Sequence, residues 1–349
     1  MSEESVEKTK TKLDKNLATS SPEANKQEVE GDIQRLLLVA SAQNVSDIHL
    51  RVGLPPMFRS YGDIISTNFP VVSLQSMQQM AQWLIPERLY PALKEKRDLD
   101  FGVSWNGQRL RVNMLYDMGR MGFVIRLVRT SIPDLKTLNL PRSIEAFPSL
   151  SSGLVLLTGP TGCGKSTTLA SIIEQININS QKHIVTIEDP VEFIYTSKKS
   201  LITQRQLGVD TDSFSMAIRQ ALRQNPDVML IGELRDRDTA FSAMKAAETG
   251  ILVFATLHTP DAVQTLNRLI HMFEPGEQPT IRDHLAHVLR AVVSQRLYHP
   301  LNSEDGRAAV AEVVLVTNTV KDYLIRNDLD TLYRLVDESR LGEMQSMNS

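Results

Sequence analysis

The sequence predicts an α/β protein in which a mostly parallel sheet, with helices on both faces, follows a smaller α+β domain. The first observation is a set of short apolar runs of strand type, at residues 154–158, 183–187, 228–231 and 252–257. Stretches with helical spacing of apolar residues separate these runs, which is typical of parallel sheets. The second observation is the different pattern of residues 32–129, where two helical stripes accompany several alternating strands.

The composition is that of a globular protein with room for two domains. The 349 residues are 42% hydrophobic and 23% charged. A formal net charge of −3 gives no overall field suited to nucleic acid, and we expect no nucleic-acid partner. The single cysteine, Cys163, excludes an internal disulfide and a four-cysteine zinc site. No apolar run approaches the roughly 20 residues of a membrane span and no signal peptide is visible, so we expect a cytoplasmic protein.

The first domain is expected over residues 32–129. Residues 1–31 alternate Lys and Glu with Ser, Thr and Asn, which predicts a disordered charged tail. Asp32 is the predicted N-cap of the first helix, and Ser73 opens the second. The stripes expected to be buried are Ile33, Leu36, Leu37 and Ala40 in the first helix and Leu74, Met77, Ala81 and Leu84 in the second.

Strands of this domain are expected at residues 46–50, 99–103, 109–114 and 123–128. Asn106-Gly107 predicts a hairpin between the second and third of them. The outward face of the returning strand carries Arg109 and Arg111, and the last strand carries Arg126. Arginines on the outer face of a sheet are most often solvated surface, and the alternative is an anion contact made with a neighbouring subunit.

The second domain is expected over residues 142–337. Residues 130–141 are expected to be a linker before it and 338–349 a flexible tail after it.

A phosphate-binding loop is the strongest motif of the sequence. Within the second domain, residues 159–166 fit G-x-x-x-x-G-K-[ST] between a strand and a helix predicted over 167–178. Lys165 would reach the β- and γ-phosphates of a nucleotide and the Ser166 hydroxyl would hold Mg²⁺, the alternative being a chance glycine turn. The candidate nucleotide-binding residues are Gly159, Thr161, Gly162, Cys163, Gly164, Lys165, Ser166 and Thr167.

Polar residues follow the other predicted parallel strands where each strand ends. Glu188, Asp189 and Glu192 follow the second strand, Glu233 the third and His258 the fourth. Ligands of open parallel sheets bind beyond these strand ends, so we expect the side chains to converge there.

Each of these residues has more than one possible role. Glu233 could orient an attacking water, or it could cap a helix. Because Gly232 precedes Glu233 where an aspartate could stand, Mg²⁺ must rely on Ser166, phosphates and waters, with the acidic cluster as a further source of ligands. Glu192 is a second candidate, and the choice among the three acids is open. His258 could bond a γ-phosphate, or it could be a packed or surface histidine.

Four segments together resemble the Walker A, Asp box, Walker B and His box of the type II/type IV secretion ATPases: residues 159–167, 186–192, 232–236 and 255–259. Three N-terminal segments resemble the pilus-retraction (PilT/PilU-like) branch of that family: residues 46–50, 53–57 and 109–113. The resemblance covers about residues 32–315. It implies a PAS-like first domain, a RecA-like P-loop ATPase domain and a homohexameric ring whose sites are completed by a neighbouring subunit.

The resemblance also implies a function and the roles of residues. The function is Mg²⁺-dependent ATP hydrolysis that powers type IV pilus retraction, hence twitching motility, with an inner-membrane platform protein and a paralogous retraction ATPase as partners. The chain would then be cytoplasmic and peripheral to the inner membrane. Carried over position by position, the catalytic residues are Glu192, Glu233, His258, Arg111 and Arg126.

Two departures from the family pattern keep other functions open. Ile251 stands where the His box usually begins with histidine, which would leave nucleotide sensing with one histidine fewer. The family's C-terminal Ala-Ile-Arg motif is absent, and residues 319–326 take its place. A catalytically weak regulatory subunit is therefore one alternative. The others are an extension or secretion motor of the same family and a RecA-like DNA translocase or helicase.

Overall fold

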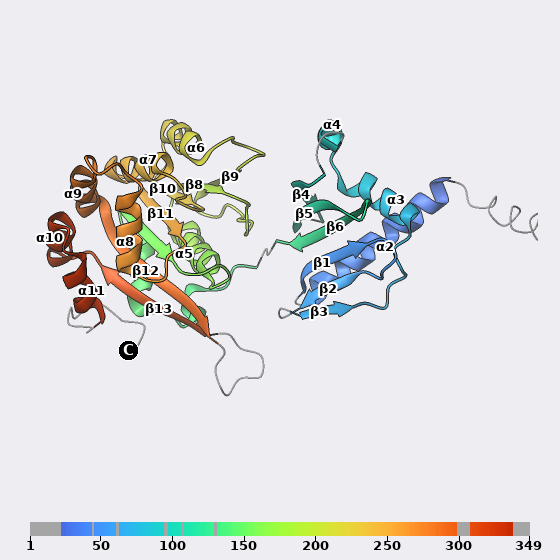
Figure 1. Ribbon diagram of the computed structural model, residues 1–349, viewed down its shortest axis with the longest axis horizontal. Helices are drawn as coiled ribbons and strands as arrows, with labels where there is room; N and C mark the ends of the chain where they lie inside the picture. The colour runs from blue at the N-terminus through green and yellow to red at the C-terminus, as the bar shows by residue number, and fades with distance from the viewer. Residues whose placement is uncertain are drawn as a thin grey trace, which may run out of the picture. The chain divides into compact units, whose positions relative to one another are not determined.

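The computed structural model describes residues 22–43, 45–60, 63–93, 97–106, 108–128, 131–298 and 308–337. The chain divides into two compact units, with the boundary directly after Val128 (Figure 1). Both units mix helices and strands, and the second contains a parallel-rich sheet, so the predicted α/β fold is confirmed. Among the described residues, no helix combines the length and the apolar character that crossing a bilayer requires.

The first unit is built on an antiparallel sheet in the order β3-β2-β1-β6-β5-β4. Its strands are β1 (Val45–Arg51), β2 (Met57–Ser60), β3 (Asp63–Ser66), β4 (Leu99–Trp105), β5 (Gln108–Asp117) and β6 (Arg120–Leu127). Its helical elements are α2 (Pro22–Ala42), α3 (Leu74–Leu84), η1 (Glu87–Leu89) and α4 (Tyr90–Leu93). The predicted hairpin joins β4 to β5, with Asn106 at φ 46° in the left-handed region that such turns need. The resemblance of this unit to PAS domains stays a prediction.

The core of the first unit lies between the helices and one face of the sheet. The sheet contributes the alternate residues of its central strands, among them Ile48, Leu50, Leu110, Val112, Met114, Phe123 and Ile125. The stripe of α2 is buried as predicted: Ile33, Leu36, Leu37 and Ala40. In α3, the prediction holds for Met77, Ala81 and Leu84 but is wrong for Leu74, which is 56% exposed. Leu74 is the first residue of α3, at the end of the buried stripe, and Met80 is buried in the helix instead.

The predicted start of the first helix at Asp32 is wrong. Helix α2 begins at Pro22, so residues 22–31, which were expected to be disordered, are helical. These residues contain only one large apolar side chain, so hydrophobic periodicity could not reveal the helix. They are rich in Glu, Ala, Lys and Gln, which favour helix, and they extend a helix already anchored by its buried stripe. Residues 1–21 and 338–349 lie outside the described part of the chain.

The second unit is built on a seven-stranded sheet in the order β13-β12-β7-β11-β10-β8-β9. All neighbours are parallel except β13, which pairs with β12 antiparallel. Its strands are β7 (Gly153–Thr158), β8 (His183–Glu188), β9 (Leu201–Gln206), β10 (Val228–Ile231), β11 (Leu252–Leu257), β12 (Leu289–Tyr298) and β13 (Ala308–Leu315). The four predicted strands are therefore confirmed as β7, β8, β10 and β11, while β9, β12 and β13 were not predicted.

Helices cover both faces of this sheet, as the sequence predicts (Figure 1). One face packs against α5 (Lys165–Asn179), η2 (Leu135–Leu138) and η3 (Arg142–Ser149). The other packs against α6 (Phe214–Ala221), α7 (Arg237–Glu248), α8 (Ala262–His271), α9 (Gln278–Val288), α10 (Asn318–Arg326) and α11 (Leu329–Asp337). A short η4 (Leu222–Gln224) follows α6. The described part of the expected linker 130–141 includes η2, whose Leu135 is buried with Ile144 and Phe147.

Candidate active site

The phosphate-binding loop connects β7 to α5, as the sequence predicts. Gly164 is the N-cap of α5 and makes no side-chain cap, so the first N–H groups of the helix have no such partner. Gly159 and Gly164 have φ values of 135° and 93°, which favour glycine. A Cβ at Gly159 would collide with the Gln295 carbonyl oxygen, and one at Gly164 would lie 2.8 Å from Gln295 Nε2. The loop is therefore pressed against β12, with a helix N-terminus open to an anion.

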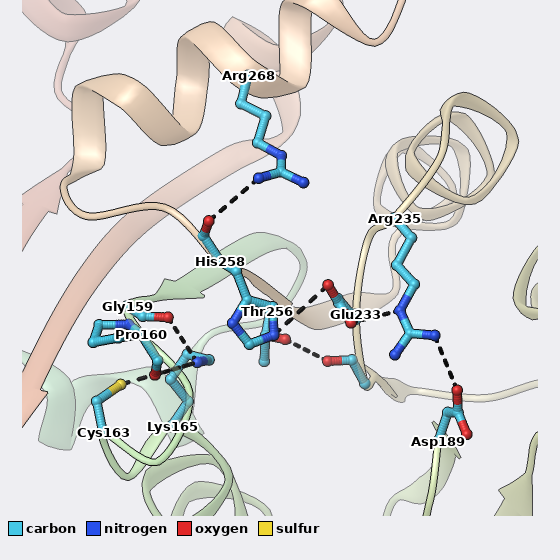
Figure 2. Close-up of polar contacts among 11 residues, drawn as sticks. Gly159, Pro160, Cys163, Lys165, Asp189, Glu233, Arg235, Thr256, His258 and Arg268 are labelled. Atoms are coloured by element: carbon cyan, nitrogen blue, oxygen red, sulfur yellow. Dashed lines mark hydrogen bonds and ion pairs between the residues drawn. The ribbon is translucent and has the colours of Figure 1, made fainter.

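Lys165 lies inside the loop. Its Nζ donates hydrogen bonds to the carbonyl oxygens of Gly159 at 2.8 Å and Pro160 at 3.0 Å, and lies 3.9 Å from Cys163 Sγ (Figure 2). Burial lowers the pKa of Lys165, and the charges of Cys163, Glu192 and Glu233 oppose that shift. Two carboxylates of the strand ends therefore lie close enough to act on the ammonium group electrostatically. This is the charge arrangement that a bound triphosphate would meet.

Gln295 on β12 braces the loop from the protein interior, and sequence reasoning missed it. Its side chain is buried, and its Nε2 donates to the Cys163 carbonyl oxygen at 2.9 Å. Its Oε1 accepts a hydrogen bond from Thr168 Oγ1, also at 2.9 Å. The signal in the sequence was the short apolar run 291–293 followed by Ser294 and Gln295, both of which are buried.

The ends of β8, β10 and β11 meet beyond the loop (Figure 2). Glu233, two residues after β10, accepts a hydrogen bond at 2.6 Å from Arg235 Nε through its Oε2. The other oxygen, Oε1, lies 3.6 Å from His258 Nε2, and Arg235 Nη1 donates to Asp189 Oδ2 at 3.1 Å. These contacts raise the pKa of Arg235, chiefly through its hydrogen bond to Glu233. Three strand ends are thus connected by Asp189, Glu233 and His258, which the sequence singled out, and by Arg235, which it did not.

The acids after β8 have different surroundings. Glu188 is buried and bonded by Thr186 Oγ1 at 2.7 Å and Gln204 Nε2 at 3.3 Å. Burial raises its pKa to about 7, although those hydrogen bonds favour the charged form. Asp189 is occupied by Arg235, whereas Glu192 acts on Lys165. Glu188 and Asp189 thus both have side-chain partners within the chain, and the catalytic role of Glu192 stays a prediction.

Ile251 lies at the edge of the sheet opposite the phosphate loop. It precedes β11, and its carbonyl oxygen accepts a hydrogen bond from Gly153 N at 3.1 Å, where β7 begins. The side chain is packed in the core beneath α7. His258, by contrast, follows the last residue of β11, and a six-residue strand spans about 20 Å. Within one chain, Ile251 and His258 therefore stand at opposite ends of β11, and the expectation that nucleotide sensing has one histidine fewer stays a prediction.

Two other sequence-predicted features belong to other elements of the chain. Residues 319–326 fall in α10, whose Val320 and Leu324 are buried in the core. The arginines Arg109, Arg111 and Arg126 belong to the first unit. Arg126 Nε bonds to Asp47 Oδ1 at 2.7 Å, and Arg111 Nε lies 3.8 Å from Asp100 Oδ1.

Ser166 is the residue that could hold a metal ion. It occupies the second position of α5, directly after Lys165. No group of three or more His, Cys, Asp or Glu side chains in the described ranges could enclose a metal ion. This donor set fits Mg²⁺, which is usually held by one or two protein oxygens together with phosphates and waters.

Comparisons with known proteins agree with this geometry. The sequence matches the type II/IV secretion system protein family over residues 23–345. It is 36% identical over 318 residues to the type IV pilus retraction ATPase PilT of Pseudomonas aeruginosa, covering 91% of this chain and 92% of that protein. The type IV pilus ATPase PilU of the same organism is 35% identical, with 91% and 83% covered. The crystal structure of the pilus retraction motor PilT with bound ADP superposes with a TM-score of 0.83 at 37% identity, covering 90% of each chain.

Proposed function

The chain belongs to the type II/IV secretion system protein family and is an ATP-hydrolysing enzyme, and from this premise we propose that it powers type IV pilus retraction as a homohexameric ring. One observation carries the proposal for the site. The end of β10 brings Glu233 beside His258 and into electrostatic reach of Lys165, at the edge of the sheet where the phosphate loop lies. This edge is where parallel sheets bind their ligands.

In the proposed mechanism, the loop and α5 bind the triphosphate of ATP. Backbone N–H groups and the positive end of α5 hold the phosphate oxygens, and Lys165 exchanges its loop carbonyls for the β- and γ-phosphates. Ser166 would hold Mg²⁺, which neutralises charge on the phosphate oxygens. Binding the triphosphate thus compensates the burial that lowers the pKa of Lys165.

Glu233 is the proposed carboxylate that orients the attacking water. Its side chain is only 18% exposed, and Arg235 fixes one of its oxygens. The second oxygen lies 3.6 Å from His258, which could therefore respond to the presence of the γ-phosphate. Glu192, the last residue of the Asp box (residues 186–192), is proposed as the second catalytic glutamate. Positioning of this kind is the main protein contribution to phosphoryl transfer.

Arg111 and Arg126 are proposed to act on the nucleotide of a neighbouring subunit. A cationic group at the γ-phosphate stabilises the charge of the transition state, as arginine fingers do. ATP would thus draw the first unit of one subunit toward the second unit of the next, and hydrolysis would release it. Sequential firing around the ring would produce the mechanical work.

The proposed partners follow from the relatives. The names PilT and PilU belong to pilus ATPases, and the match to PilT extends over nearly the whole of both chains. We therefore propose a cytoplasmic motor that contacts an inner-membrane platform protein of the pilus machinery. A paralogous retraction ATPase is proposed as a second partner.

Replacing Lys165 and Glu233 separately tests the proposed site. Lys165→Ala removes the cation for the phosphates, and Glu233→Gln removes the carboxylate for water while keeping its shape. Both variants should lose steady-state ATP hydrolysis, and only the glutamine variant should still bind ATP. Glu145→Gln, at an exposed position on η3, is the matched control and should hydrolyse ATP normally. Full hydrolysis by either site variant would refute the assignment, and ATPase activity confined to mixtures with a paralogue would favour a regulatory subunit.

A further inference from the structure

Two arginines of the first unit lie directly opposite each other. Arg111 on β5 and Arg126 on β6 are register partners, on the sheet face away from the core. Like charges directly opposite on neighbouring strands destabilise a sheet. The repulsion between the two guanidinium groups therefore destabilises this part of the sheet unless acidic side chains nearby offset it.

Asp47 neutralises Arg126 from the next strand. Asp47 lies on β1 in register with Arg126 on one side and with Arg59 of β2 on the other. Its side chain is buried, its Oδ1 accepts from Arg126 Nε at 2.7 Å, and its Oδ2 accepts from Ser46 Oγ at 2.9 Å. A carboxylate is costly to bury unless it is paired and hydrogen-bonded, and these contacts meet that condition.

The way in which Arg126 is held leaves its outer nitrogens available. Its side chain remains 59% exposed, although its Nε is bonded to a buried group. Among the described residues, no partner is recorded for Nη1 or Nη2 of Arg126. Arginine is a long side chain that loses much rotamer freedom when it binds, and a fixed Nε removes part of that loss in advance.

Arg111 is held far more loosely than its opposite neighbour. Its Nε lies 3.8 Å from Asp100 Oδ1, and both side chains are exposed, at 37% and 58%. Exposed pairs of this kind contribute little because water and salt screen them. The two arginines therefore differ in one respect: Arg126 is fixed at its base, and Arg111 is free to change its partner.

We propose that Asp47 is a positioning residue that fixes the base of Arg126, so that Nη1 and Nη2 are presented to a phosphate of ATP bound by a second copy of this chain. The inference rests on the proposed function, in which Arg126 acts across a subunit boundary. Fixed donors stabilise a transition state without reorganisation at the moment of reaction, and a misplacement of about 1 Å can cost on the order of 10²-fold in rate.

A double-mutant cycle on the full-length protein tests the assignment. Arg126→Ala should lower kcat for ATP hydrolysis on the order of 10³-fold, as loss of an arginine finger does. Asp47→Asn should lower kcat on the order of 10-fold, with KM for ATP almost unchanged, because the nucleotide is still bound by its own loop. The double variant should be no slower than Arg126→Ala alone. Asp63→Asn, at an exposed position on β3 of the same sheet, is the matched control.

The outcomes separate this inference from the proposed function. If Arg126→Ala hydrolyses ATP normally, the proposed role of Arg126 across the boundary fails. If Arg126→Ala is impaired but Asp47→Asn is not, only the positioning role of Asp47 is overturned. An Asp47→Asn effect that persists undiminished without Arg126 also overturns it, since a general structural loss would behave in that way. If Asp47→Asn unfolds, Ser46→Ala removes the hydroxyl that bonds Oδ2 and that also lies 3.2 Å from the Arg59 carbonyl oxygen, and its expected fall in kcat of a few-fold must likewise vanish without Arg126.

Discussion

Replacing Gln295 with leucine measures how strongly the phosphate loop depends on β12. Leucine keeps much of the volume but leaves the Cys163 carbonyl oxygen and the Thr168 hydroxyl without their partner. Each buried polar group left unpaired costs about 1–3 kcal/mol, so the loss of both partners should lower the free energy of unfolding of the second unit by about 2–6 kcal/mol. If about 1.4 kcal/mol of that cost falls on the nucleotide-binding conformation of the loop, ATP affinity drops about tenfold.

The assay follows denaturant unfolding by circular dichroism and binding of a fluorescent ATP analogue in the same preparation. Gln278→Leu is the control, because Gln278 at the start of α9 donates one hydrogen bond through Nε2 to the Phe273 carbonyl oxygen, between α8 and α9, and has no contact with the phosphate loop among the described residues. The control should lose about 1 kcal/mol of stability and keep its ATP affinity. Unchanged unfolding and unchanged ATP binding in Gln295→Leu would show that β12 does not brace the loop.

Three further substitutions have defined outcomes. Burial raises the pKa of Glu188 to about 7 in the folded protein, from an ordinary value of 4.5. The folded protein therefore binds a proton that the unfolded chain has lost, and the free energy of unfolding falls by about 3 kcal/mol as pH rises from below 4.5 to above 7. Glu188→Gln should remove this pH dependence, measured by denaturant titration at several pH values. Ile251→His should cost about 1–3 kcal/mol in thermal unfolding, because it buries a polar group, and should not raise ATP hydrolysis. Arg235→Ala breaks the bridges that a half-exposed guanidinium makes to Glu233 and Asp189, so it should change stability by about 1 kcal/mol, while kcat falls about tenfold because Glu233 is no longer held.

Local patterns explain why much of the second unit could be predicted. The strands β7, β8, β10 and β11 are fully or almost fully buried apolar runs, and such runs stand out from their surroundings. The glycine loop between β7 and α5 has a fixed spacing because backbone geometry demands it. Placement of Glu233 and His258 at one edge then followed from the rule for parallel strand ends.

The missed features depend on contacts between distant parts of the chain. The edge strand β9 is half-exposed and largely polar, so its residues give no strand signal by themselves. Gln295 contacts Cys163, which is 132 positions earlier in the sequence, and no local pattern encodes that meeting. Asp47 and Arg126 are likewise 79 positions apart and meet only because β1 pairs with β6.

The His box shows how neighbours in a sequence motif can be separated in the fold. Ile251 and His258 belong to one sequence motif, but they flank β11 at its two ends. A motif that spans a whole strand necessarily places its first and last residues at opposite edges of the sheet. Proximity in the sequence was therefore no guide to proximity at the nucleotide.

The most direct measurement is electron cryomicroscopy of the full-length protein with Mg²⁺ and a non-hydrolysable ATP analogue. Our account predicts a homohexameric ring in which Nη1 and Nη2 of Arg126, with Arg111 beside it, lie within hydrogen-bond distance of a γ-phosphate held by Lys165 of the adjacent subunit. A monomer under these conditions, or a ring in which both arginines point away from every nucleotide, would contradict it.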